Sequence, residues 1–158
     1  MNAVHDPFTH PASRLALEVF RLNGALISAG DTLVAPLGLT SARWQVLGAI
    51  AEAGGALPTA GIARNMGLTR QSVQRVVDDL AARGLVCFAT NPHHKRAKLV
   101  QLTAAGTQAF AAASARWAPL ADLLLARIGP AAAEAAATTL HQLRTTLSEA
   151  GAGSGDPT

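Results

Sequence analysis

The sequence predicts a mainly α-helical (α+β) fold, in which a helix-turn-helix and a two-stranded hairpin lie between long N- and C-terminal helices. A segment with one apolar and one polar helical face covers about residues 70–80. Two β-prone segments follow at 85–90 and 97–102, separated by a turn. Narrow apolar seams mark both ends of the chain. With 158 residues, 49% of them hydrophobic, the chain is long and apolar enough for one domain with a core.

The N-terminal residues 12–35 are expected to form a long helix. Apolar residues recur there at alternating three- and four-residue steps, which places them on one narrow seam. Such a seam usually faces another helix, so this helix is expected to serve dimerisation. The seam residues are Leu15, Val19 and Leu22.

Capping residues predict three helices, of which the last two form the helix-turn-helix. A helix is expected to begin after Thr40 as its N-cap and to end before Gly54. The next, short helix begins near Thr59 and ends at Gly67, which is placed to be a left-handed C-terminal cap. Thr69 caps the following helix after almost no connection, and two short helices joined in this way form a helix-turn-helix.

The helix that follows Thr69 has two distinct faces. Its aliphatic residues, which fall within an arc of about 100° and are expected in the core, are Val73, Val76, Val77 and Leu80. The residues of the opposite, polar arc are Arg70, Gln71, Gln74, Arg75 and Asp78. Guanidinium groups pair with guanine and carboxamides with adenine in the major groove, so this face is equipped to read DNA. A polar outer face is also typical of any surface helix, and that interpretation stays open.

A basic turn between the two β-prone segments makes the motif winged. The turn covers residues 91–98 and contains His93, His94, Lys95, Arg96 and Lys98. Eight Arg and Lys against three Asp and Glu give residues 41–104 a net charge of +5, whereas residues 1–40 and 105–158 each have −1. The excess positive charge therefore lies in the middle of the chain, as binding to a polyanion requires.

The C-terminal third predicts two more helices. Thr103 is expected to cap a long helix that Pro119 kinks, and Gly129-Pro130 separates it from a last helix. The last helix carries a second seam of Leu140, Leu143 and Leu147. The two terminal seams are expected to pack together and against a second copy, because a dimer can read two half-sites about 10 base pairs apart.

Several motifs occur in a fixed order along about residues 12–150. They are Leu39-Thr40, Trp44-Gln45-Val46-Leu47, Ile62-Ala63, Met66 to Val73, Arg83-Gly84-Leu85-Val86, Asn91-Pro92, Arg96-Ala97, and Val100-Gln101-Leu102-Thr103 with Gly106. In this order and spacing the chain resembles the MarR family of transcriptional regulators. The resemblance implies a homodimeric winged helix-turn-helix protein that binds pseudo-palindromic DNA, often as a repressor. It also implies release by a small, frequently aromatic ligand.

The resemblance assigns roles to individual residues. It implies base contacts by Arg70, Gln71, Gln74 and Arg75, phosphate contacts by Thr69 and Ser72, and entry of Arg96 into the minor groove. His94, Lys95 and Lys98 are expected to add contacts from the wing. Acidic residues usually brace the wing arginine in the family, but Asn91 and His94 stand at those positions here. Arg96 is therefore expected to be less rigidly oriented, or the histidines to contact phosphate themselves.

Three further expectations concern sensing. In the family an effector cleft lies where the dimerisation helices meet the DNA-binding lobe, and Arg43 and Trp44 are its candidate lining residues, although Trp44 is also a core candidate. Cys87 is expected to be an inert buried thiol in an apolar strand, with redox sensing as the alternative. Neighbouring hairpin residues point to opposite faces, so His93 and His94 are poor metal ligands, and neither a metal nor another cofactor is expected.

The remaining expectations concern class and domains. The residues suggest no catalytic set, so the chain is not expected to be an enzyme. A soluble cytoplasmic protein is expected, with double-stranded DNA, a second copy and a small effector as partners, and no membrane. The alternative is a winged-helix module that binds an acidic protein, or nucleic acid without sequence preference. The expected divisions are a flexible tail at 1–11, a dimerisation helix at 12–35, the DNA-binding lobe at 36–103, dimerisation helices at 104–150 and a tail at 151–158.

Overall fold

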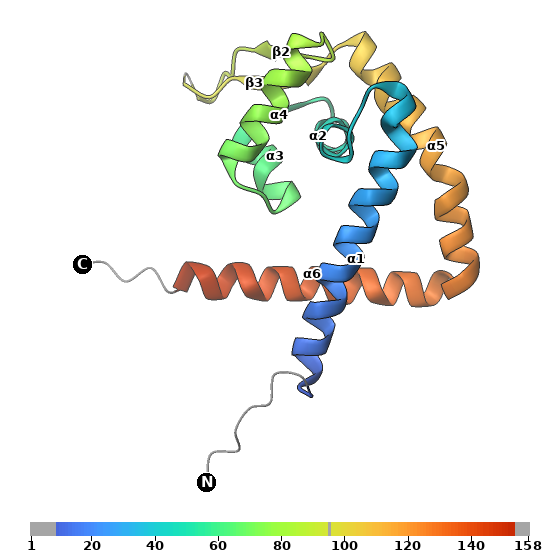
Figure 1. Ribbon diagram of the computed structural model, residues 1–158. Coiled ribbons are helices and arrows are strands. Elements are labelled where there is room, and N and C mark those ends of the chain that lie inside the picture. Colours follow the sequence, from blue (N-terminus) through green and yellow to red (C-terminus); the bar gives the residue numbers. More distant parts are fainter. Residues whose placement is uncertain (1–8, 95, 154–158) are drawn as a thin grey trace. The chain divides into compact units, whose positions relative to one another are not determined.

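The computed structural model describes residues 9–94 and 96–153 and has the predicted mainly α-helical, winged helix-turn-helix architecture (Figure 1). In chain order the elements are α1 (Pro11–Val34), the short 3-10 helix η1 (Ala35–Leu37), α2 (Ser41–Glu52), β1 (Ala56–Pro58), α3 (Thr59–Met66), α4 (Arg70–Ala82), β2 (Val86–Ala89), β3 (Leu99–Leu102), α5 (Ala104–Ile128) and α6 (Pro130–Gly153). The chain forms two compact units, Met1–Trp117 and Ala118–Thr158. The first unit contains the helix-turn-helix and the wing.

The terminal helices extend slightly beyond their predicted bounds. α1 begins at Pro11, and α6 continues to Gly153, inside the predicted tail at 151–158. Residues 1–8 and 154–158 of the predicted tails lie outside the described residues, whereas Thr9 and His10 are described. No single helix of the described part could span a membrane by length and composition, and one helix pair, Pro11–Leu37 with Ser41–Glu52, qualifies only together and is bent by 86°.

The helix-turn-helix is built by the predicted caps. The Thr40 hydroxyl accepts a hydrogen bond from the Arg43 amide, and the Thr69 hydroxyl accepts one from the Ser72 amide at 3.1 Å. Gly67 has a φ of 64°, so it is the left-handed residue that ends α3. Only Gly67, Leu68 and Thr69 separate α3 from α4, which lie beside each other in Figure 1.

The core of the first unit fixes which face of α4 points outward. Val73, Val77 and Leu80 are fully buried, as predicted, and Val76 packs against them from a partly buried position. They pack with fully buried residues of other elements, namely Val34, Val46, Leu47, Ile50, Ile62 and Val100. Burying a side chain of this size contributes about 1.5–3 kcal/mol. The aliphatic arc of α4 therefore holds its polar arc towards solvent.

The sheet has three strands, one more than the hairpin predicted from the sequence. The order is β1-β3-β2, and both pairings are antiparallel. β1 pairs Leu57 with Val100 and ends at Pro58. Proline lacks an N–H group and is confined to edge positions, and β1 is an edge strand. Three residues are too few to show an alternating pattern, so β1 can be identified as a strand only from its pairing with β3.

Cys87 is exposed, so the prediction that it is a buried thiol is wrong. Successive side chains of a strand point to opposite faces, and in β2 the core side is taken by Val86, which is 3% exposed. Cys87 follows it on the other face. Phe88 returns to the side of Val86 but is 42% exposed, so the apolar run 85–88 does not form a continuous buried strand.

Both predicted seams contain exposed leucines. On α1, in the first unit, Leu15 and Leu22 are exposed and Val19 is partly buried. In the second unit, Leu140, Leu143 and Leu147 of α6 are all exposed. Pro119 lies within α5, and the kink expected there stays a prediction.

The start of α5 is locked to the end of the helix-turn-helix. Thr103 donates its hydroxyl hydrogen to the Gly84 carbonyl at 2.7 Å, and the same oxygen accepts from the Gly106 amide at 3.0 Å. Gly106 lies so close to this connection that a Cβ atom on it would be 1.9 Å from the Leu85 carbonyl oxygen. The spacing from Thr103 to Gly106 thus meets a steric requirement.

We expect Gly106→Ala to destabilise the protein by about 2–3 kcal/mol, because the backbone must shift to admit the methyl group. Gly24→Ala is the matched control, since Gly24 lies inside α1 with nothing within 4 Å of its added Cβ. That control should stabilise the chain by about 0.5–1 kcal/mol. Urea unfolding at equal protein concentrations measures both changes, and equal stability of Gly106→Ala and the wild type would contradict the steric argument.

Candidate nucleic-acid interface

The outward face of α4 presents three polar side chains that have no partner in the described part of the chain. Arg70, Gln71 and Arg75 are exposed, and within the described residues none of them forms a side-chain hydrogen bond or ion pair. Gln74 differs, because its amide nitrogen donates to an Asp78 carboxylate oxygen at 2.8 Å and its side chain is partly buried. The face predicted to read bases thus contains three available groups and one that is already engaged.

Thr69 and Ser72 lie together at the beginning of α4. Their hydroxyl oxygens are 2.7 Å apart, within hydrogen-bonding distance, and the Thr69 hydroxyl also caps the helix. Both residues are exposed. Their predicted phosphate contacts stay a prediction, and Thr69 has in addition a structural role as the N-cap.

Asn91 shapes the wing turn through the backbone. Its side-chain oxygen accepts from the His93 amide at 3.0 Å, and its carbonyl accepts from the His94 amide at 3.3 Å. Within the described residues, no contact joins Asn91 to the guanidinium of Arg96, which is exposed. The Lys98 ammonium lies 5.8 Å from the centre of the Phe88 ring, a cation–π arrangement. Lys95, also predicted to bind DNA, lies outside the described residues.

A cavity of about 560 Å³ opens between the helix-turn-helix and the wing. Its charged and imidazole-bearing lining residues are Arg64 from α3, Arg70 from α4, and His94, Arg96 and Lys98 from the wing, and no Asp or Glu is among its lining residues. The cavity thereby brings together five predicted site residues, namely Arg70, Gln74, His94, Arg96 and Lys98. Gln71 and Arg75 are not part of the lining. Arg64 was not predicted as a site residue, and only its charge in the last turn of α3 could have singled it out.

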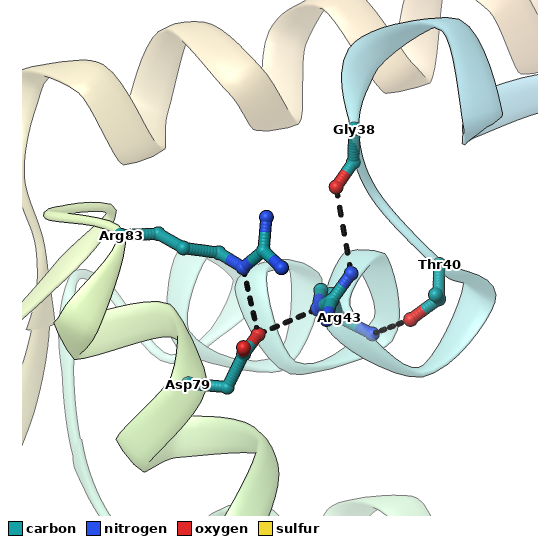
Figure 2. Close-up of polar contacts among 5 residues, drawn as sticks. All are labelled: Gly38, Thr40, Arg43, Asp79 and Arg83. Carbon is teal, nitrogen blue, oxygen red and sulfur yellow. Dashed lines mark hydrogen bonds and ion pairs between the residues drawn. The ribbon is translucent and has the colours of Figure 1, made fainter.

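A carboxylate bridges two arginines on another side of α4 (Figure 2). One oxygen of Asp79 accepts from Arg43 Nε at 2.6 Å and from Arg83 Nε at 2.9 Å. Arg43 also donates to the Gly38 carbonyl at 3.4 Å. The bridge therefore connects α2, and the loop before it, to the C-terminal half of α4.

The bridge contains two positive charges and one negative charge. Partial burial alone would raise the pKa of Asp79, but the hydrogen bonds and positive charges of Arg43 and Arg83 hold it below the ordinary value of 3.8. Asp79 neutralises only part of the charge of its two partners. Arg64, Arg70, Arg75 and Arg96 form no ion pair in the described part of the chain, so the free positive charge faces the cavity and the outward face of α4.

The two predicted effector residues are adjacent on α2 but have different neighbours. Arg43 belongs to the bridge to Asp79. The Trp44 ring lies 5.9 Å from the Trp117 ring of α5, at an interplanar angle of 58°. Trp44 is partly buried and packs against the core, which agrees with its interpretation as a core residue.

Comparison with known proteins identifies the fold and the family. The sequence model of the MarR family matches residues 37–97, from η1 to the wing. An uncharacterised protein of Mycobacterium tuberculosis is 36% identical over 131 residues, which cover 83% of this chain and 90% of the relative. The chain belongs to the MarR family of transcriptional regulators.

Solved structures of other proteins resemble the fold of this chain. A MarR-family regulator from Streptomyces coelicolor is 25% identical, with a TM-score of 0.72 and coverage of 88% of this chain and 96% of the other. CouR from Rhodococcus jostii, solved with p-coumaroyl-CoA, is 24% identical with a TM-score of 0.72, covering 89% of this chain and 95% of its own. A MarR mutant from E. coli, solved with operator DNA, is 20% identical with a TM-score of 0.71, covering 82% and 93%. The last two likenesses concern the fold alone.

We expect Asp79→Asn to lower the melting temperature at pH 7, because the neutral amide loses both charge-assisted bonds. Since the pKa of Asp79 is lowered in the folded state, its contribution to stability is fully present above the unfolded-state value near 3.8. The contribution is lost as pH falls through the lower folded-state pKa. The gap between the wild type and Asp79→Asn should therefore shrink below about pH 4.

The matched control for this prediction is Asp78→Asn. Asp78 neighbours Asp79 but is exposed and bonded to Gln74. Thermal melts from pH 2.5 to 7 for the three proteins measure the effect. A gap for Asp79→Asn that is the same at every pH, or one equal to that of Asp78→Asn, would contradict the bridge.

Proposed function

We propose that this MarR-family chain is a homodimeric, sequence-specific DNA-binding repressor of pseudo-palindromic operators, and that a small ligand releases it. The observation that carries the proposal is the outward face of α4, where Arg70, Gln71 and Arg75 are exposed and unpaired beside a cation-lined cavity. Guanidinium and carboxamide groups make bidentate contacts with guanine and adenine, each discriminating by about 1–3 kcal/mol. The E. coli MarR mutant solved with operator DNA has a similar fold and supports a DNA ligand.

The exposed apolar seams support the homodimer. Leu15 and Leu22 on α1, and Leu140, Leu143 and Leu147 on α6, are large apolar residues that the described chain leaves in contact with solvent. Exposed apolar residues that cluster along one helix mark interaction sites in soluble proteins. Burial against a second copy would place two α4 helices on one duplex, and the two-fold symmetry of the dimer would be matched by a pseudo-palindromic site.

We expect selection from random duplex DNA at moderate salt to recover a pseudo-palindromic motif with half-sites about 10 base pairs apart. Gln71→Ala and Arg75→Ala should each weaken binding and relax the preference at one base pair per half-site, by about 1–3 kcal/mol. Arg96→Ala should weaken binding to all sequences alike. Repeating the selection with each variant measures these effects.

Each outcome of that selection has a distinct meaning. No enriched motif, together with salt-dependent binding, would replace the proposal by non-specific binding of the basic lobe to nucleic acid or an acidic protein. An enriched single half-site without symmetry would contradict the dimer. If the recovered site, placed at a promoter, raised reporter transcription when the protein is present, the repressor role would be wrong.

The effector is proposed to act close to Arg43 and Trp44. CouR, whose structure contains p-coumaroyl-CoA, shows that an aromatic thioester can be bound by a protein of this fold. In this chain Trp44 and Trp117 offer aromatic surface, and Arg43 offers a guanidinium that Asp79 only partly neutralises. A planar aromatic acid fits these groups by ring packing and charge.

We expect an aromatic acid that binds there to change the tryptophan fluorescence, since Trp44 and Trp117 are the two tryptophans of the chain. The same acid should reduce DNA affinity. Trp117→Phe should diminish the fluorescence response without changing sequence preference, because Trp117 lies outside the DNA-reading face. A panel of aromatic acids that leaves both fluorescence and DNA affinity unchanged would count against this site.

A further inference from the structure

We propose that Arg64 binds a backbone phosphate of the duplex in the cavity between α3, α4 and the wing. The inference rests on the proposed DNA-binding function and adds a residue to it. Arg64 belongs to α3, the helix before the DNA-reading helix, and lies in its last turn. Neither the sequence motifs nor the polar arc of α4 assigns it a role.

Arg64 is an available cation at a shared site. Its side chain is exposed, and no hydrogen bond or ion pair within the described residues engages it. Arg43 and Arg83, in the same lobe, are both held by Asp79. An arginine that stabilised the fold would be expected to pair in this way. Arg64 instead adds its charge to the cavity lining.

The cavity has the chemistry of a phosphate site. Arg64, Arg70, Arg96 and Lys98 reach it from α3, α4 and the wing, and His94 and Gln74 add further hydrogen-bonding groups. No carboxylate lines it, so four positive charges share about 560 Å³ without internal compensation. An anion that enters between these cations reduces their mutual repulsion. A phosphodiester offers two charged oxygens that guanidinium groups bind with charge-assisted hydrogen bonds.

The position of the cavity favours a backbone phosphate over a base edge. Of the four α4 residues expected to contact bases, Gln71 and Arg75 do not line it, whereas Arg70 and Gln74 do. The lining comes from three elements on both sides of the hollow, so a strand lying between helix and wing would meet donors on each side. Phosphate contacts fix the register of a protein on DNA and carry affinity without reading sequence. Arg64 is therefore a positioning contact.

We expect Arg64→Ala to reduce the affinity for the selected duplex about tenfold at 0.15 M salt. The slope of log affinity against log salt should become less steep by about 0.9 per bound copy, because one fewer counterion is released. The ratio of affinities for selected and random duplexes should stay unchanged. Arg64→Lys keeps the charge and should keep the slope. Asn65→Ala, at the neighbouring exposed position of α3, serves as the control for a substitution in this helix that removes no charge.

Single-phosphate modification distinguishes a direct contact from a general field effect. Ethylating one phosphate at a time should reveal a position in each half-site where wild-type binding weakens but Arg64→Ala binding does not weaken further. The inference is wrong if Arg64→Ala binds as tightly as the wild type, or if every ethylation that weakens wild-type binding also weakens the binding of Arg64→Ala. Sequence-specific binding would still stand in either case. If no duplex is selected by the wild type, both the proposed function and this inference fail. Circular dichroism and melting of Arg64→Ala verify that the exposed substitution leaves the fold intact.

Discussion

The carboxylate of Asp79 is the polar interaction that ties α4 to α2 within the arrangement set by the buried core. It joins Arg43 of α2 to Arg83 at the end of α4, so it links α4 to the helix packed behind it. The apolar core alone would not define the rotation of α4 as tightly, because hydrophobic contacts are non-directional whereas the bridge joins particular atoms. Arg43 and Arg83 are also less available to other anions, because both are bonded to Asp79.

The cations of the lobe are consequently divided by location. Arg43 and Arg83, which have a carboxylate partner, lie on the side of α4 that faces α2. The arginines of the described lobe that form no ion pair face the cavity or the outward surface. The acidic residues of α4 are Asp78 and Asp79, and both lie in its C-terminal half. Its N-terminal half, with Arg70 and Arg75, is free of acidic residues. A polyanion would therefore meet the least repulsion at that end of α4 and at the wing.

The sequence predicted those features that depend on local spacing. The two faces of α4 followed from a 3.6-residue period, and the caps Thr40, Gly67 and Thr69 followed from residue type next to each helix end. β1 could not be predicted in this way, since three residues become a strand only through pairing with β3, about forty residues later. The exposure of Cys87 was missed because a four-residue apolar strand alternates between two environments that composition does not distinguish. The Arg43–Asp79 pair joins residues 36 positions apart, and no local pattern indicates it.

The candidate site was predictable to the same extent and for the same reason. Arg70, Gln71 and Arg75 belong to one helical face, so their common exposure follows from a period. Arg64 lies on a different helix, and its approach to Arg96 and Lys98 depends on how α3 and the wing flank α4 in three dimensions. A cluster built from three elements has no signature in any one of them. A change in the wing would alter this cluster first, because the wing contributes three of its charged or imidazole groups. The outward face of α4 is held by the buried Val73, Val77 and Leu80. In the proposed function, affinity and sequence preference therefore depend on different parts of the fold, so a substitution in the wing is expected to weaken affinity and leave sequence preference intact.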